Sequence, residues 1–217
     1  MAVITAPSTD GRPTIREAAR LKTPGGIAPW WYNWVDRHRV GGIVLVGVIA
    51  TQLGTYFGYV FPAIGLPTLP WPLYNGILGT TFADGLNGAT ATGAFDPVFA
   101  TSPGSFFTGQ ALHFVNGIVF SILYAVLFLP LMPFRNTRGG NVASGLLYSI
   151  IMSIISVGLL VPYAYVPEQG YGFFSFYGPD GWKLPAAVLV WHLIYGFFLG
   201  TLFMVRNHEG YEAVSSD

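Results

Sequence analysis

Cysteine is absent from this 217-residue chain, and charged side chains are scarce. Without cysteine there is no disulfide bond, thiolate metal site, covalent haem attachment through Cys-x-x-Cys-His, or lipidation on cysteine. Charged residues make up 9% of the chain and hydrophobic residues 52%. So few charges cannot cover the surface of a water-soluble domain of this size, which favours an integral membrane protein.

Four stretches of the chain lack Asp, Glu, Lys and Arg altogether: residues 43–62, 106–130, 141–162 and 184–205. At a helical rise of about 1.5 Å per residue, each can cross a hydrocarbon core of roughly 30 Å. The sequence therefore predicts an all-α integral membrane protein. Its expected parts are an N-terminal segment (1–40), a four-helix membrane domain (41–205) with outer loops at 63–105 and 163–183, and a tail (206–217).

The basic residues are distributed unevenly. Nine of the ten lie in the N-terminal segment, the turn at residues 134–140 and the C-terminal tail, whereas Lys183 lies in an outer loop. By the positive-inside rule, both termini are predicted to be cytoplasmic, as in a multi-pass protein of the bacterial cytoplasmic membrane. No basic face with interleaved aromatic residues remains for nucleic acid.

Large aromatic residues come directly before the first span: Trp30, Trp31, Tyr32 and Trp34. They precede the basic residues Arg37 and Arg39. Aromatic side chains prefer the level of the lipid headgroups, so this segment is predicted to form an aromatic belt in the bilayer interface. The lipid bilayer is therefore an expected partner of the chain.

The pattern Gly-Gly-x-Val-x-x-Gly occurs twice, beginning at residue 41 and again at residue 139, an offset of 98 residues. The second and fourth apolar stretches each hold one histidine with a glycine four residues later, His113 with Gly117 and His192 with Gly196. The repeated unit is thus a pair of helices. We expect a four-transmembrane-helix bundle built from two parallel helix-pair repeats.

Small residues recur at four-residue intervals within the spans. At this spacing they let helix backbones approach closely, and hydroxyl groups among them can hydrogen-bond across the contact. The predicted helix-packing residues are Gly47, Thr51, Gly54, Thr55, Gly58, Gly117, Ser121, Gly145, Ser149, Ser153, Gly196 and Gly200.

His113 and His192 lie on these small-residue faces, so both are predicted to point into the bundle. Such a pair can ligate a haem b iron axially, with Gly117 and Gly196 leaving room for the macrocycle, or each histidine can hold one chlorin pigment. The alternative, which we favour, is that each imidazole hydrogen-bonds a neighbouring helix and locks the bundle. Two histidines without a carboxylate or thiolate do not make a zinc or non-haem iron site.

The predicted spans contain no acid, and no nucleophile–base constellation is apparent, so we expect no enzymatic activity. We expect a non-catalytic subunit or scaffold of a larger membrane complex, such as a respiratory, photosynthetic or other metalloenzyme assembly. The alternatives are a small haem- or pigment-binding protein and a small dimeric transporter. The outer loops are aromatic and poor in charge, and we expect them to bind other integral membrane subunits through Trp71, Tyr74, Phe173, Phe174, Phe176 and Tyr177.

Two segments carry a family resemblance. Residues 109–129, with Leu112-His113-Phe114, Gly117 and Tyr124-Ala125, and residues 191–203 resemble an uncharacterised family of small bacterial four-helix membrane proteins. The resemblance implies a four-helix membrane fold, and it implies no activity.

Overall fold

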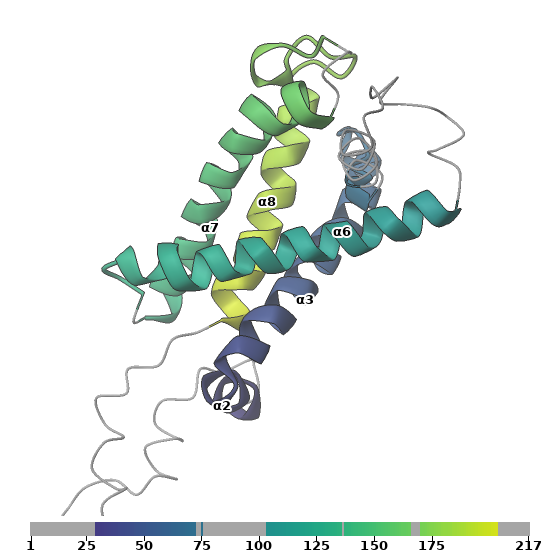
Figure 1. Cartoon of the computed structure of the whole chain (residues 1–217). Helices are drawn as coiled ribbons and strands as arrows, with labels where there is room; N and C mark the ends of the chain where they lie inside the picture. Colours follow the sequence, from purple (N-terminus) through teal and green to yellow (C-terminus); the bar gives the residue numbers. More distant parts are fainter. Residues whose placement is uncertain (1–28, 73–74, 76–102, 136, 166–169, 204–217) are drawn as a thin grey trace, which may run out of the picture.

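In a computed structural model of the chain, the residues described are 29–72, 75, 103–135, 137–165 and 170–203. They form an all-α structure in which four long apolar helices pack together (Figure 1). Each is long and apolar enough to cross a membrane: Arg39–Ile64, Phe107–Leu131, Arg138–Ala164 and Lys183–Leu202. The expected all-α bundle with four candidate membrane spans is thus confirmed.

The described elements, in chain order, are α2 (Pro29–Arg37), α3 (Arg39–Val60), η1 (Phe61–Ile64), α6 (Pro103–Ile122), η2 (Leu123–Phe128), η3 (Leu129–Leu131), α7 (Arg138–Ile155), η4 (Ser156–Tyr165), η6 (Phe173–Ser175) and α8 (Lys183–Leu202). α3 packs against both α6 and α8, and α7 packs along α8. α6 runs obliquely across the other long helices (Figure 1).

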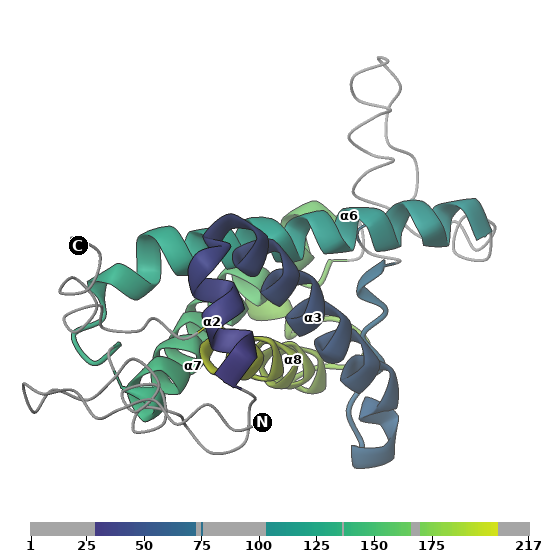
Figure 2. The same ribbon diagram turned by 90° about the horizontal axis from the view of Figure 1, so that it is seen from below.

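The short helix α2 lies across the end of the bundle where α3 begins and α8 ends (Figure 2). The indole of Trp31 donates to the carbonyl oxygen of Leu202 at 3.0 Å, and the Tyr32 hydroxyl donates to that of Thr201 at 3.2 Å. Trp30, by contrast, is 65% exposed. The aromatic segment expected before the first span is therefore a helix that packs on the bundle through one face.

The fourth helix ends at Leu202, and the Asn141 side chain binds the carbonyls at this end. Its Nδ2 donates to the carbonyl oxygens of Gly200 and Phe203, both at 2.7 Å. Because the last carbonyls of a helix have no partner within the helix, a side chain that binds them stabilises its end. Such a contact from another helix is not visible in the sequence of the span itself.

The third span contains a π-helical segment, η4, that the spacing of its residues did not predict. Pro162 lies inside η4 and has no N–H, so it cannot donate to Val157, its π-helical acceptor five residues earlier. The hydroxyl of Ser175 donates to the Val157 carbonyl at 2.9 Å instead. The loop before α8 is thereby attached to the end of the third span.

The helices meet at small residues, and all of the predicted helix-packing residues are buried. Gly54 and Gly58 on α3 make room for the indole of Trp191 on α8. A Cβ atom added at Gly54 would lie 3.0 Å from Trp191 Cε2, and one at Gly58 would lie 3.1 Å from Cδ1. A larger residue at either glycine would therefore push α3 and α8 apart.

Candidate functional site

The centre of the bundle holds a buried network around His113. The Thr55 hydroxyl donates to the carbonyl oxygen of Thr51 at 2.8 Å, and its oxygen lies 2.8 Å from His113 Nε2. A hydroxyl has only one proton, so Thr55 must accept from His113. The imidazole therefore carries its proton on Nε2, and Nδ1 is an acceptor.

Asn75, in the segment that follows the first span and has helical backbone, completes this network. Its Nδ2 donates to the carbonyl oxygen of Trp71 at 2.8 Å and lies 3.2 Å from His113 Nδ1. The amide of Asn116 on α6 donates to Asn75 Oδ1. Both nitrogens of His113 are thus hydrogen-bonded. Axial ligation of a haem iron by His113 would break one of these bonds, so this geometry favours the bundle-locking interpretation of His113.

His192 on α8 has a different environment, although it is also buried at 7% exposure. Its Nδ1 lies 2.8 Å from the carbonyl oxygen of Val188, one turn earlier on the same helix. Nδ1 must therefore be the protonated nitrogen, which leaves Nε2 with a free lone pair. Within the described part of the chain, no group hydrogen-bonds to this Nε2. Trp191 contacts both histidines, with ring centroids 5.7 Å from His113 and 5.1 Å from His192.

A cavity of about 50 Å³ lies beside the two histidines, and all four long helices contribute to its wall. Its apolar lining includes Phe120, Met152 and Leu160. Two buried polar atoms on residues of the wall have no hydrogen-bond partner among the described residues, Thr51 Oγ1 and Trp191 Nε1. The surface that the cavity exposes is mostly apolar, and its volume corresponds to about three to five water-sized groups, because each needs about 10–15 Å³.

Trp71 differs from the expectation that it belongs to an outer docking surface. It is 5% exposed, and its ring lies 5.7 Å from that of Trp191 and 6.2 Å from that of His192. The chain after η1 therefore folds back into the bundle and places Trp71 and Asn75 beside the cavity. Proline residues on both sides of Trp71 gave no sign of this, because prolines also suit an exposed loop. Tyr74, expected in the same surface, lies outside the described residues.

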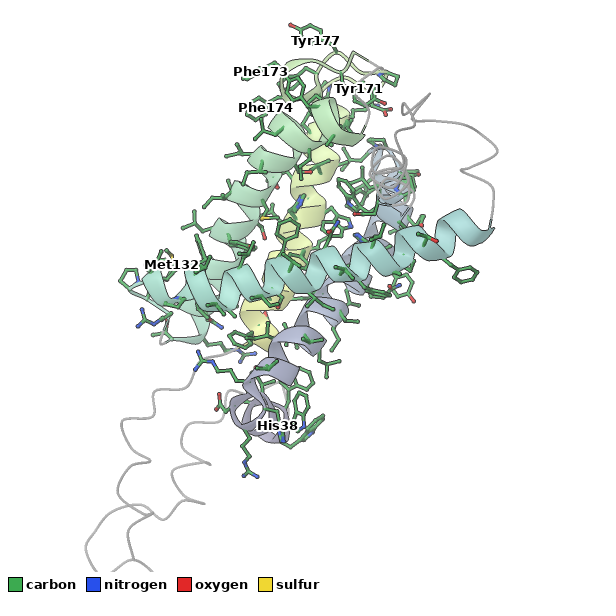
Figure 3. All side chains as sticks on the ribbon, viewed as in Figure 1. His38, Met132, Tyr171, Phe173, Phe174 and Tyr177 are labelled. Carbon is green, nitrogen blue, oxygen red and sulfur yellow. The ribbon has the colours of Figure 1, made fainter. Side chains whose placement is uncertain are left out.

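The second outer loop does expose aromatic side chains. Phe173 is 68% exposed and Tyr177 78%, and Phe176 is exposed as well. Figure 3 shows Tyr177 directed away from the helices at the end of the bundle opposite His38. Phe174 is instead half-buried, and its ring packs beside Gly158 of the third span. Of the four predicted residues in this loop, three are therefore available to a partner.

The backbone of this loop is held in an uncommon conformation. Phe174 has φ 51° and Ser175 has φ 60°, in the left-handed region that non-glycine residues rarely adopt. The loop closes through the Tyr177 amide, which donates to the carbonyl oxygen of Tyr171 at 3.0 Å. Burial raises the pKa of the Tyr171 phenol, and the nearby Asp180 carboxylate raises it further, so the phenol stays neutral.

Comparison with known proteins gives no match: no family model, no curated protein and no solved structure is detectably similar to the chain. Fold and site together define the class, an all-α protein with four candidate membrane spans and a small cavity between them beside two buried histidines.

Proposed function

We propose that this chain is a non-catalytic integral membrane subunit of a larger membrane complex and that the loop before α8 docks on another subunit. The observation that supports this best is the conformation of the loop. Ser175 is tied to Val157 of the third span, while Phe173 and Tyr177 extend outward. Strained, non-glycine backbone persists only where the surrounding structure holds it, and such positions are often functional.

The exposed side chains indicate the chemistry of the partner surface. Phe173, Phe176 and Tyr177 are large, aromatic and uncharged, and such residues dominate the energetic centres of protein interfaces. Asp180 and Lys183 are the charged residues described near them. This loop therefore fits a partner with an apolar surface at the level of the lipid headgroups. The outer edge of a second membrane subunit lies at that level.

The proposed topology places both termini in the cytoplasm. All four arginines among the described residues lie near the start of α3 or the start of α7: Arg37, Arg39, Arg135 and Arg138. Asn141 joins the start of α7 to the end of α8, and Trp31 joins α2 to the end of α8, so these segments share one end of the bundle. The positive-inside rule assigns that end to the cytoplasm and the aromatic loop to the outside.

Two parallel repeats of a helix pair are also part of the proposal. Gly117 on α6 packs directly against the Thr51 hydroxyl on α3. Gly196 on α8 packs in the same way against the Ser149 hydroxyl on α7. Thr51 and Ser149 are separated by the same 98 residues that separate the two glycine-rich patterns. Equivalent contacts at equivalent positions support a duplicated helix pair.

Docking is tested by the size of the native complex. After gentle solubilisation, the tagged chain should migrate on a native gel above the size of the purified protein. Replacing Phe173, Phe176 and Tyr177 together by Ser should reduce it to that size, because the apolar contact is lost while Phe174 and Ser175 still hold the loop. Trp30→Ser removes an equally exposed aromatic residue at the other end and should leave the complex intact. Migration of the triple variant with the wild type would contradict the docking role.

Topology is tested with single cysteines, which the cysteine-free chain makes unambiguous. Asp180→Cys in the outer loop should react with an impermeant thiol reagent added outside intact cells. Gly139→Cys should react only after the cells are opened; a side chain at Gly139 meets no atom within 4 Å, so the fold tolerates it. Labelling of both cysteines from the same side would rule out this topology.

A further inference from the structure

We propose that α2 and the turn that joins it to α3 bind the headgroup of an anionic phospholipid, with Arg37 and Arg39 in contact with its phosphate. This inference rests on the proposed membrane location of the chain but not on the docking role, because the aromatic loop lies at the opposite end of the bundle (Figure 3). Two features carry it. α2 lies across the end of the spans, and the two arginines are exposed without a partner among the described residues.

α2 is attached to the bundle through one face. Trp31 and Tyr32 donate to carbonyl oxygens at the end of α8. Val35 is buried and packs against Gly42 of α3. Trp30, on the same short helix, is 65% exposed. α2 therefore crosses the end of the bundle where α3 begins, with an exposed indole (Figure 2). A short helix in this position lies along the membrane surface, at the level of the lipid headgroups that indoles prefer.

The turn from α2 into α3 is held in place by hydrogen bonds. The backbone N–H of His38 and its Nδ1 both donate to the carbonyl oxygen of Trp34, at 2.9 and 3.0 Å. The imidazole stacks on the Trp34 indole, with ring centroids 5.2 Å apart. The N–H of Gly42 donates in turn to the His38 carbonyl. Arg37 and Arg39 flank His38, so both arginines extend from a fixed backbone, which lowers the entropy cost of binding.

The described part of the protein does not neutralise Arg37 or Arg39. Both residues are exposed, and no described residue forms an ion pair or a hydrogen bond with either side chain. Arg135, at the same end of the bundle, differs because its guanidinium donates to the carbonyl oxygens of Pro130 and Met132. Arg37 and Arg39 therefore keep their donors for a group outside the described protein.

An anionic phospholipid offers the matching group. A planar guanidinium binds phosphate oxygens through two parallel hydrogen bonds, and basic residues beside a span attract anionic headgroups. Asp36 is the acidic residue described in α2, so α2 and the turn together keep a net positive charge. A phosphocholine headgroup brings its own cation next to the arginines, which weakens the attraction. The preferred headgroup therefore has no cation, as in phosphatidylglycerol.

The opposite end of the bundle provides a contrast within the same molecule. Asp180 and Lys183 are the charged residues described there, and their charges cancel. We therefore expect one end of the protein, rather than its whole perimeter, to select anionic lipid.

Native mass spectrometry of the purified full-length protein, released from detergent micelles, measures the phospholipids that stay bound. Dioleoyl-phosphatidylglycerol and dioleoyl-phosphatidylcholine are added together at equal concentration, so only the headgroups differ. We expect the wild type to retain phosphatidylglycerol with a preference of about tenfold. Replacing Arg37 and Arg39 together by Gln should lower the preference to about twofold or less, whereas replacing both by Lys should keep most of it, because the charge remains.

A matched control separates this end of the bundle from the other. Lys183→Gln removes one exposed positive charge near the aromatic loop and should leave the preference unchanged. Arg39→Gln removes one positive charge at the proposed site and should lower the preference about threefold. Glycerol phosphate carries the headgroup charge without acyl chains, so an excess of it should not displace bound phosphatidylglycerol.

The outcomes that overturn the proposal are equally definite. Equal retention of the two lipids by the wild type would refute it. A preference that survives both glutamine substitutions, or that Lys183→Gln lowers as much as Arg39→Gln does, would place the bound lipid elsewhere. Displacement by glycerol phosphate would indicate a site for a soluble phosphate compound instead of a lipid. Native-gel size tests the docking role and cysteine labelling tests the topology, so loss of the lipid preference alone refutes only this inference.

Discussion

The contact between α3 and α6 and the contact between α7 and α8 use the same spacing of small residues but differ in their polar groups. In the α7–α8 contact, Gly196 lies against the backbone carbonyl of Gly145. The hydroxyls of Ser149 and Ser153 donate to carbonyls of their own helix at 2.9 and 2.8 Å. This contact is backbone against backbone, and its hydroxyl groups are satisfied locally.

In the α3–α6 contact, the backbones meet at Gly47, which lies against the backbone of Gly117, but one turn further along a side chain lies between them. Gly117 lies against the side chain of Thr51, whose hydroxyl is unpaired. Thr55 reaches across to His113. The contact of Thr55 with His113 and the unpaired Thr51 hydroxyl make this helix contact more polar than the α7–α8 contact. One helix pair thus satisfies its hydroxyl groups within its own helix, while the other joins the hydrogen-bond network around His113.

The largest expected effect on stability comes from adding a methyl group at the glycine of each contact, and its size should differ between the two contacts. Gly196→Ala should cost about 3 kcal/mol of stability, because the new methyl group meets both the Ser149 hydroxyl and the carbonyl of Gly145. Gly117→Ala should cost about 2 kcal/mol, because the atoms nearest the new methyl group belong to the Thr51 side chain, which can move more easily than backbone. Unfolding in detergent, followed by circular dichroism, measures both changes.

Second substitutions sharpen this test. Thr51→Ala should recover more than half of the loss in Gly117→Ala, since it removes the hydroxyl that the methyl group meets. Ser149→Ala should recover little in Gly196→Ala, because the backbone carbonyl remains. Equal recovery of stability in the two double variants would show that the α3–α6 and α7–α8 contacts do not differ in this way.

The sequence predicts the helices and their buried faces because both depend on local patterns. The lack of charge marks the spans, and residues such as Gly47 and Ser121 recur at helical intervals on faces that the structure buries. His113 and His192 are buried for the same reason. Four-residue spacing determines which side of a helix a residue occupies, and composition determines that this side faces other helices.

Contacts between distant segments are what the sequence does not reveal. Trp71 and Asn75 belong to a loop that composition alone assigns to the outside, but they pack beside His113 and Trp191. Ser175 replaces the donor missing at Pro162, a role that depends on how a π-helical segment and a loop meet. No local spacing encodes such pairs.

The two histidines should differ in their contribution to stability. His113→Phe leaves Thr55 and Asn75 without their buried partner and should cost about 2 kcal/mol. His192→Phe removes one bond within its own helix and should cost less than about 1 kcal/mol. Both variants and the wild type should be colourless, because a haem shared by the two histidines needs a free nitrogen on His113, and both of its nitrogens are hydrogen-bonded. A Soret band in the wild type that both variants lose would instead establish a shared haem.

The smallest expected effects on stability concern the hydroxyl groups of Thr51 and Thr55, which lie one turn apart on α3. Thr55→Val removes the acceptor of His113 and should cost about 0.6–2 kcal/mol, the usual worth of a polar contact between membrane helices. Thr51→Val removes a buried hydroxyl that has no partner, so it should be neutral or stabilise the protein by about 1 kcal/mol. The substitution is the same at both positions, and valine preserves the shape of threonine, so the difference reports hydrogen bonding alone. Denaturant unfolding of the two variants in the same detergent measures it. If Thr51→Val costs as much as Thr55→Val, the Thr51 hydroxyl is already satisfied, and the α3–α6 contact is as closed as the α7–α8 contact.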